Sequence, residues 1–263
     1  MSAAERDQAT VNHAPAIRMR SAGEGGLVIE MGRVIAPRIN AAVQHLAEKL
    51  SRKRPEGMIE VVPAYCSLLV YFDPLVLSRA ALVEAVARIV AGDLEPEVAA
   101  SERVRIIQIP VCYGGEFGPD LDYVAQVHGL TTEEVITIHR ARSYRVYMVG
   151  FTPGFPYLGE LSERIATPRL EKPRTLVPRG SVGIAGTQTG IYPVDSPGGW
   201  RLIGRTPVPL FMPEAAHPFL FSPGDNVRFN SVTADRYREI ARQVEAGSYL
   251  PEVVRACREA AGV

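Results

Sequence analysis

The uneven placement of proline and glycine is the strongest constraint on what this chain can fold into. Between positions 150 and 225 lie 12 of the 21 prolines and 11 of the 23 glycines. Proline removes a backbone donor and glycine permits tight turns, so long helices are not expected in this region. Short apolar runs between such turns are typical of a β-sandwich or a closed barrel. We expect strands at residues 146–150, 180–186, 200–204, 208–211 and 226–229.

The first hundred residues have a different pattern, in which short strands alternate with helices. Apolar residues predict strands at 26–31, 59–63 and 67–72, and Val43, Leu46 and Leu50 fall at helical spacing between the first two. A second helix is expected after Ser78, whose hydroxyl can cap it. This pattern predicts a small α+β domain, with two helices against one face of a sheet.

The remaining segments complete the expected organisation. A strand is predicted at 104–111. A helix is predicted after Asp120, which we interpret mainly as its cap. A further helix is predicted to begin at Thr131, because a threonine cap followed by early acidic residues suits a helix N-terminus. We expect a disordered leader at 1–16, the α+β domain at 17–100, a mainly-β barrel at 101–231 and a helical tail at 232–263. Val253, Val254 and Ala256 belong to that helical tail by their spacing.

Composition excludes several classes of protein. The chain has 29 basic and 29 acidic residues and 46% hydrophobic residues, a balance that argues against a polybasic nucleic-acid binder and against a disordered chain. Three cysteines without a CxxC pair predict neither a disulfide framework nor a metal site. No apolar run is long enough to span a membrane, and no signal peptide is recognisable, so we expect a cytoplasmic protein.

Common catalytic motifs are missing from the sequence. There is no Walker A loop, no HExxH and no GxGxxG that opens a helix. Residues 180–183 lack the spacing of a GxSxG nucleophile elbow. The glycine-rich stretch 183–190 has no lysine, so a tight barrel corner is favoured there over a nucleotide site.

Rigid turns that carry arginines and aromatic residues are the best candidates for a site. They occupy residues 150–159, 168–174 and 192–207, and residues 163–205 contain seven basic against three acidic side chains. Planar guanidinium groups bind carboxylates, and aromatic rings form the walls of pockets or the centres of protein interfaces. Arginines on the solvated rim of a barrel would give the same pattern. The expected walls of a pocket or interface are Phe155, Tyr157 and Trp200.

His139, near the end of a predicted helix, is the candidate proton carrier, because an ordinary histidine titrates near neutral pH. The alternative is a histidine that only satisfies internal hydrogen bonds or the helix C-terminus.

Taken together, these stretches resemble a known family. Residues 111–121 (VCYGGEFGPDL) look like its PVxYGGExGPDL segment, and residues 150–159, 168–174, 180–193, 196–207 and 223–229 resemble the rest of its pattern in order. The family is the allophanate hydrolase subunit 1-like, carboxyltransferase-related group. It includes the B subunit of bacterial 5-oxoprolinase and an inhibitor of a sporulation kinase.

The resemblance implies a fold, an activity and partners. The expected fold is an α+β N-terminal domain followed by a cyclophilin-like barrel. The expected activity is that of one subunit of an ATP-dependent 5-oxoprolinase, which opens 5-oxo-L-proline to L-glutamate. The expected partners are a second, related carboxyltransferase-like subunit (the C subunit) and a third one (the A subunit). ATP would be used by the complex, with no cofactor assigned to this chain.

Within this hypothesis, side-chain chemistry suggests roles for the candidate residues. Arg169, Arg174 and Arg205 would hold carboxylate or phosphate groups. Gln188 and Tyr192 would orient the ring amide or a bound intermediate. Two alternatives stay open: a regulator that inhibits a sensor histidine kinase through the same turns, and one component of an allophanate or urea amidolyase-type hydrolase.

Overall fold

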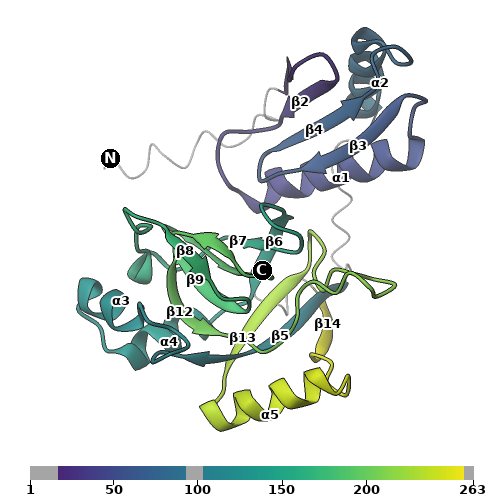
Figure 1. Cartoon of the computed structure of the whole chain (residues 1–263). Coiled ribbons are helices and arrows are strands. Elements are labelled where there is room, and N and C mark those ends of the chain that lie inside the picture. Colours follow the sequence, from purple (N-terminus) through teal and green to yellow (C-terminus); the bar gives the residue numbers. More distant parts are fainter. Residues whose placement is uncertain (1–16, 93–102, 258–263) are drawn as a thin grey trace, which may run out of the picture. The chain divides into compact units, whose positions relative to one another are not determined.

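A computed structural model describes residues 17–92 and 103–257 of the chain. The predicted leader at 1–16 lies outside the described residues, as do positions 93–102 and 258–263. The chain divides into two compact units, Met1–Glu97 and Val98–Val263. Figure 1 traces both units along the sequence.

The first unit is a four-stranded antiparallel sheet with two helices. Its strands are β1 (Arg18–Ser21), β2 (Gly26–Glu30), β3 (Met58–Pro63) and β4 (Ser67–Phe72), in the order β1-β2-β4-β3. Alternate residues of β4, namely Leu68, Val70 and Phe72, are buried, which is the period of a sheet with one covered face. The predicted strands are confirmed, and β1 is an additional one.

Both helices of this unit pack on the buried face of the sheet. Helix α1 (Pro37–Lys53) begins with proline, whose fixed φ suits the first helical turn, and α2 is Arg79–Gly92. The Ser78 hydroxyl accepts from the Ala81 amide at 3.2 Å, so the predicted cap is confirmed. One apolar core holds the strands and both helices together, with α1 contributing Val43, Leu46 and Leu50 and α2 contributing Leu82, Val86 and Ile89.

The second unit is a closed barrel of seven strands, as the alternation of short apolar runs and turns predicts. The strands run β12 (Arg201–Arg205), β9 (Ser181–Ala185), β10 (Gln188–Ile191), β7 (Pro156–Leu158), β6 (Tyr144–Val149), β13 (Asn226–Ser231) and β5 (Arg103–Tyr113). Pairing of β12 with β5, Gly204 opposite Tyr113, closes the barrel. The sheet is mixed, because β13 and β5 are parallel.

The interior of the barrel is the largest apolar core in the described residues. Ile107, Ile109 and Val111 of β5 and Val182 and Ile184 of β9 contribute to it. Helices α3 (Leu121–His128) and α4 (Thr132–Arg140) add residues from outside the strands (Figure 1). The Thr131 hydroxyl accepts from the Glu134 amide at 3.2 Å, which confirms a capped start for α4.

Two sequence predictions for this unit are wrong. The tail is not helical throughout: α5 (Ala234–Glu245) is followed by strand β14 (Val253–Cys257), which pairs antiparallel with β5. The backbone N–H and C=O groups along one edge of β5 pair with β14, and the helical spacing of Val253, Val254 and Ala256 gives no sign of this pairing. Residues 208–211 form no strand; their only β contact in the described chain is an isolated bridge between Phe211 and Phe219.

Candidate functional site

A small two-stranded ribbon forms one wall of the candidate site. Strand β8 (Arg174–Val177) pairs with β11 (Ser196–Gly198), apart from the barrel sheet. Beneath it lies an apolar cluster that is separate from the barrel core. Its residues are Phe155, Val177, Ala185, Tyr192, Trp200 and Leu202, with Tyr157 packed against them.

Aromatic rings in this cluster meet edge to face. Phe155 lies 5.4 Å from Trp200 and 5.2 Å from Tyr192 between ring centroids, with both pairs nearly perpendicular, which is a favoured arrangement for aromatic pairs. Phe155, Tyr157 and Trp200, the expected walls of a pocket or interface, lie together in this cluster.

The glycine-rich stretch 183–190 is explained by these rings. A Cβ on Gly190 would stand 3.0 Å from Phe155 and from Trp200, and one on Gly183 would stand 3.0 Å from the Trp200 Cβ. The glycines therefore admit aromatic side chains against the β9–β10 hairpin. The space over them is filled by protein, which does not fit a nucleotide-binding loop.

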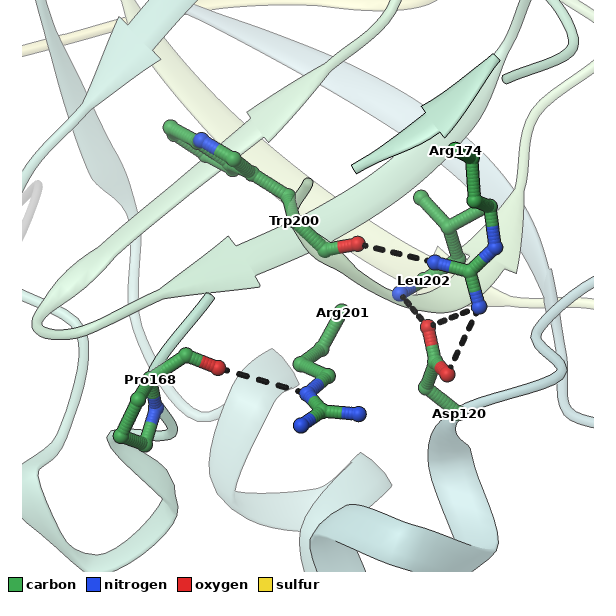
Figure 2. A network of polar contacts seen from close by, with 6 residues as sticks. All are labelled: Asp120, Pro168, Arg174, Trp200, Arg201 and Leu202. Atoms are coloured by element: carbon green, nitrogen blue, oxygen red, sulfur yellow. Dashed lines mark hydrogen bonds and ion pairs between the residues drawn. The ribbon is translucent and has the colours of Figure 1, made fainter. Parts of the chain in front are cut away.

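Asp120 and Arg174 form the central ion pair of the site. The two carboxylate oxygens of Asp120 accept from one guanidinium nitrogen of Arg174 at 2.8 and 2.9 Å. Arg174 also donates to the Trp200 carbonyl at 3.3 Å, and the Leu202 amide donates to Asp120 at 2.6 Å (Figure 2). The pair fixes the β8–β11 ribbon to β12 and to the start of α3.

This ion pair corrects one expectation, the capping role of the Asp120 side chain, and leaves substrate binding by Arg174 a prediction. Asp120 occupies the N-cap position of α3, but its side chain makes no capping hydrogen bond. Its oxygens accept hydrogen bonds from the Arg174 guanidinium and the Leu202 amide instead. The hydrogen bond to the charged guanidinium is stronger than one to a neutral helix N-terminal amide. Arg174 was a candidate for binding substrate, and the structure places its guanidinium in an internal contact.

Arg201 makes a second link across the site. Its Nε donates to the Pro168 carbonyl at 3.3 Å, as Figure 2 shows. Its guanidinium lies 3.9 Å from the centre of the Tyr123 ring, within the range of a cation–π contact. Arg201 therefore holds the 168–174 segment close to α3.

Of the three candidate arginines, Arg169, Arg174 and Arg205, Arg169 is the one most open to solvent. Its side chain is exposed, its guanidinium lies 5.9 Å from the centre of the Trp200 ring, and no ion pair engages it within residues 17–92 and 103–257. Burial raises the pKa of both Tyr157 and Tyr192, and the positive charge of Arg169 opposes this rise at each phenol. Both therefore stay protonated donors at neutral pH.

Arg205 and Gln188 lie on strands of the barrel sheet rather than on the β8–β11 ribbon. Arg205 ends β12, four residues beyond Arg201, which separates their backbones by about 13 Å in a strand. Burial raises the pKa of Tyr237 on α5, and the positive charge of Arg205 opposes that rise. Gln188 is half-buried and opens β10 opposite Ala185, at the β9–β10 turn.

His139 is fully buried, and both ring nitrogens are hydrogen-bonded. Thr189 donates to the Gly183 carbonyl at 3.0 Å, so its oxygen accepts from Nε2 of His139, also at 3.0 Å. Nδ1 of His139 then accepts from the Tyr113 hydroxyl at 2.8 Å. Burial lowers the pKa of His139 to about 3, so the ring is neutral at ordinary pH. This geometry gives it a structural role, and proton transfer by His139 stays a prediction.

Sequence reasoning missed Asp120 and Arg201 as parts of the site. Arg174 and Asp120 are 54 positions apart, and nothing in either segment marks the other as its partner. The surplus of arginines in residues 163–205 did show where cations gather. It could not distinguish arginines with internal partners, such as Arg174, from exposed ones, such as Arg169.

Neither a metal centre nor a membrane helix is found in the described residues. No group of three or more His, Cys, Asp or Glu side chains in residues 17–92 and 103–257 is placed to hold a metal ion. Over the same ranges, no helix is both long and apolar enough to cross a membrane.

Comparison with known proteins first defines the class. The family described as carboxyltransferase domain, subdomain C and D, matches residues 17–221, which include the α+β unit and most of the barrel. A urea amidolyase from K. lactis has the same fold, with a TM-score of 0.80 over 92% of this chain and 16% of its own, at 22% identity. The two units are thus of the carboxyltransferase type.

More similar proteins define the branch within that class. The B subunit of the 5-oxoprolinase of Bacillus subtilis (strain 168) is 45% identical over 82% of this chain and 92% of its own length. That of Escherichia coli O157:H7 is 41% identical over 79% of this chain and 92% of its own. The crystal structure of TTHA0988 has a TM-score of 0.70 and 41% identity, and the match covers 80% of this chain but 40% of that one. This chain belongs to the 5-oxoprolinase B-subunit branch of the carboxyltransferase subdomain C and D family.

Proposed function

We propose that this chain is the B subunit of an ATP-dependent 5-oxoprolinase, which opens 5-oxo-L-proline to L-glutamate together with partner subunits. The observation that carries the proposal is the likeness to 5-oxoprolinase B subunits over nearly their whole length, 92% of each of two relatives. In the reaction, the ring amide C–N bond breaks and a water oxygen completes the new carboxylate. ATP enters as a co-substrate of the complex.

The exposed guanidinium of Arg169 is the group that we assign to the substrate. 5-Oxoproline carries a carboxylate, and a guanidinium with no acidic partner among the described residues is suited to bind it. Tyr157, which is half-buried, contributes a protonated hydroxyl nearby, and Trp200 supplies the aromatic wall. Tyr192 is buried in the same cluster, so the proposal gives its hydroxyl no contact with the substrate. Gln188 and Arg205 remain candidates for the ring amide and for a phosphorylated group.

The proposal gives no contact with the substrate to Asp120, Arg174 or Arg201. These residues only position the aromatic wall that faces it. The ion pair of Asp120 and Arg174 anchors the Trp200 backbone, and Arg201 anchors the carbonyl that precedes Arg169. Because Arg174 is engaged internally, the proposal does not require it to contact the ligand. His139 is buried, so the proposal uses no proton transfer by it.

Two partner subunits belong to the proposal. They are the carboxyltransferase-like C subunit and the third component, the A subunit. The TTHA0988 structure supports a larger assembly, because the part similar to this chain makes up 40% of that longer chain.

Reconstitution tests the proposed function. The chain would be produced together with both partner subunits from the same genome, and glutamate and ADP would be measured after addition of 5-oxoproline and ATP. The proposal predicts glutamate formation that requires ATP and is lost when this chain is omitted. If the complete set forms no glutamate, or forms it equally well without this chain, the proposal is wrong.

A further inference from the structure

The outer wall of the barrel carries a short row of polar side chains at the end of β12. Arg205, the last residue of β12, is the register partner of Ser181 on β9 and of Cys112 on β5. Val182 and Val111, which adjoin Ser181 and Cys112, lie in the barrel core. Because side chains alternate along a strand, Ser181 and Cys112 belong to the outer face, and Arg205 shares that face with them.

Two polar atoms in this row are buried and have no hydrogen-bond partner in the described part of the chain. They are Oγ of Ser181 and Nε of Arg205. The Ser181 backbone is satisfied, since its amide donates to the Pro178 carbonyl at 3.2 Å and its carbonyl accepts from the Tyr192 amide at 2.9 Å. Buried polar groups without a partner are costly and rare, so two on neighbouring residues need an explanation. Both groups can donate, and one shared acceptor would satisfy them.

The backbone beneath these two atoms is fixed. The Thr206 amide donates to the Gly180 carbonyl at 2.9 Å, which joins the end of β12 to the turn before β9. Gly180 has a φ of +79°, a conformation that glycine adopts without strain. A Cβ on Gly180 would stand 3.4 Å from Cγ of Arg205, so the turn lies against the arginine side chain. Ser181 and Arg205 are therefore held side by side.

Helix α5 adds a third donor beside this row. The Tyr237 ring of α5 lies 4.6 Å, between centroids, from the ring of Phe117, which follows β5. Burial raises the pKa of Tyr237, and the positive charges of Arg205 and Arg179 oppose that rise. Because Coulomb interactions weaken with distance, both guanidinium groups lie in the neighbourhood of the Tyr237 hydroxyl. That hydroxyl is protonated at neutral pH, so it can donate a hydrogen bond.

The charge around the row is positive. No acidic side chain in residues 17–92 and 103–257 forms an ion pair with Arg205 or Arg179. Of the carboxylates in this region, Glu116 is paired with Arg238 at 3.7 Å, and Asp195 accepts from the Arg179 backbone amide at 2.7 Å. Two cations without acidic partners and three available donors suit an oxyanion.

We propose that Arg205, Ser181 and Tyr237 bind a phosphate group on the outer face of the barrel. A phosphate group offers at least three strong acceptor oxygens, whereas a carboxylate offers two in one plane, and the donors come from three separate elements, β12, β9 and α5. Arg205 is half-buried, and a rotation of its flexible side chain opens Nε and the Ser181 hydroxyl to the anion. The inference rests on the proposed function for the source of the phosphate, because that complex uses ATP.

This site is separate from the one that we assign to the substrate carboxylate. Arg201, which anchors the segment of Arg169, begins β12, and Arg205 ends it. A substrate carboxylate at Arg169 and a phosphate group at Arg205 would therefore occupy different ends of the strand.

Titration calorimetry on the isolated full-length chain, at constant ionic strength, tests the proposal with inorganic phosphate, ATP and 5-oxoproline as probes. Arg205→Gln removes the cation. Ser181→Ala removes a hydroxyl that has no hydrogen-bond partner in the described chain, and Tyr237→Phe keeps the ring that packs on Phe117. Arg242→Gln is the matched control, because Arg242 is an exposed cation on α5. Thermal unfolding verifies that each variant is folded.

The expected result is that the Kd for phosphate rises at least about tenfold in Arg205→Gln and about threefold or more in each hydroxyl variant, while Arg242→Gln leaves it unchanged. Ser181→Ala should be as stable as the wild type without phosphate, since the lost hydroxyl has no partner. ATP that binds more tightly than inorganic phosphate, with the same dependence on Arg205, identifies a nucleotide as the source. ATP that binds no more tightly identifies free phosphate.

Several outcomes overturn the proposal. Neither phosphate nor ATP binds the wild-type chain, or both bind Arg205→Gln as well as the wild type. Weakening in Arg205→Gln alone contradicts the assignment of the two hydroxyls, and equal weakening in Arg242→Gln shows only a general effect of charge. Binding of 5-oxoproline without phosphate, lost in Arg205→Gln, assigns the site to a carboxylate instead.

Glutamate formation by the complete complex separates this proposal from the proposed function. If the chain binds phosphate through Arg205 and the complete set forms no glutamate, the phosphate site stands and the 5-oxoprolinase assignment fails. If the set forms glutamate and the chain binds neither phosphate nor ATP, the assignment stands and the phosphate site fails.

Discussion

Arg174 contacts both carboxylate oxygens of Asp120, at 2.8 and 2.9 Å, across 54 positions of sequence. The side chains are only 28% and 10% exposed, so water screens the pair weakly. Through this contact the start of α3, the β8–β11 ribbon and the Trp200 backbone are held as one structure. The wall of the candidate site depends on it.

Removing one partner of this pair is expected to destabilise the barrel unit. Asp120→Ala leaves the Arg174 charge and the Leu202 amide without their acceptor, and we expect a loss of about 3 kcal/mol in the free energy of unfolding. Arg174→Lys should lose much of the same stability, because an ammonium cannot reproduce the contacts to Asp120 and to the Trp200 carbonyl. Denaturant unfolding measures both effects.

Glu239→Ala is the matched control, since the Arg236–Glu239 pair on α5 is about half exposed on both sides. Its effect should be much smaller. If Asp120→Ala is no more destabilising than Glu239→Ala, the ion pair does not have the role that its geometry assigns.

The buried ring of His139 predicts a specific pH dependence of stability. Its pKa is about 3 in the folded chain and about 6.5 when unfolded, so the unfolded state binds the extra proton between these values. Stability is therefore lost as pH falls below 6.5, by about 2 kcal/mol between pH 7 and pH 5. Denaturant unfolding as a function of pH measures the slope.

His139→Gln should remove that part of the slope, although it also lowers stability at all pH values. His217→Gln is the control, because His217 is exposed. A His139→Gln variant with the same slope as the wild type would contradict the buried, neutral histidine.

The glycine at position 190 should tolerate no side chain. Gly190→Ala places a methyl group 3.0 Å from Phe155, from the Pro156 carbonyl and from Trp200, so we expect a loss of about 1–3 kcal/mol. Gly150→Ala is the control, since its nearest contact would be an ordinary 3.7 Å. Trp200 is the only tryptophan, and its fluorescence reports the packing directly. An unchanged spectrum and stability in Gly190→Ala would show that the cluster is loose.

Nucleotide turnover by the isolated chain is a further prediction. Gly183 and Gly190 of the glycine-rich stretch 183–190 are packed against aromatic side chains, and the stretch has no lysine, so the purified chain alone should not hydrolyse ATP. Phosphate release at increasing stages of purification measures this. Steady turnover that follows the chain through purification would assign nucleotide chemistry to it.

Much of the fold was predictable from sequence because its signals are local. Helical spacing at Val43, Leu46 and Leu50, the Thr131 cap and the proline and glycine turns each act within a few residues. The β14 strand was missed because its pairing with β5 is a tertiary contact that overrides local spacing.

The candidate site was predictable only in its composition. The sequence located the arginines and the aromatic residues that the structure gathers around Trp200. It could not assign Arg174 to Asp120, because an ion pair between distant segments leaves no local pattern. Burial of His139 was likewise invisible, since a histidine on a helix has the same local sequence whether its ring is buried or exposed.

The kinetics of Arg169 variants in the reconstituted complex test the central claim most directly. Arg169→Ala removes the guanidinium proposed to bind the substrate carboxylate, and loss of a charge-assisted hydrogen bond predicts a rise of roughly 10- to 100-fold in the KM for 5-oxoproline. Arg169→Lys should recover part of that loss, and Lys172→Ala, an exposed cation on the same segment, should change nothing. An unchanged KM in Arg169→Ala, or an equal rise in Lys172→Ala, would contradict the assignment of Arg169 to the substrate.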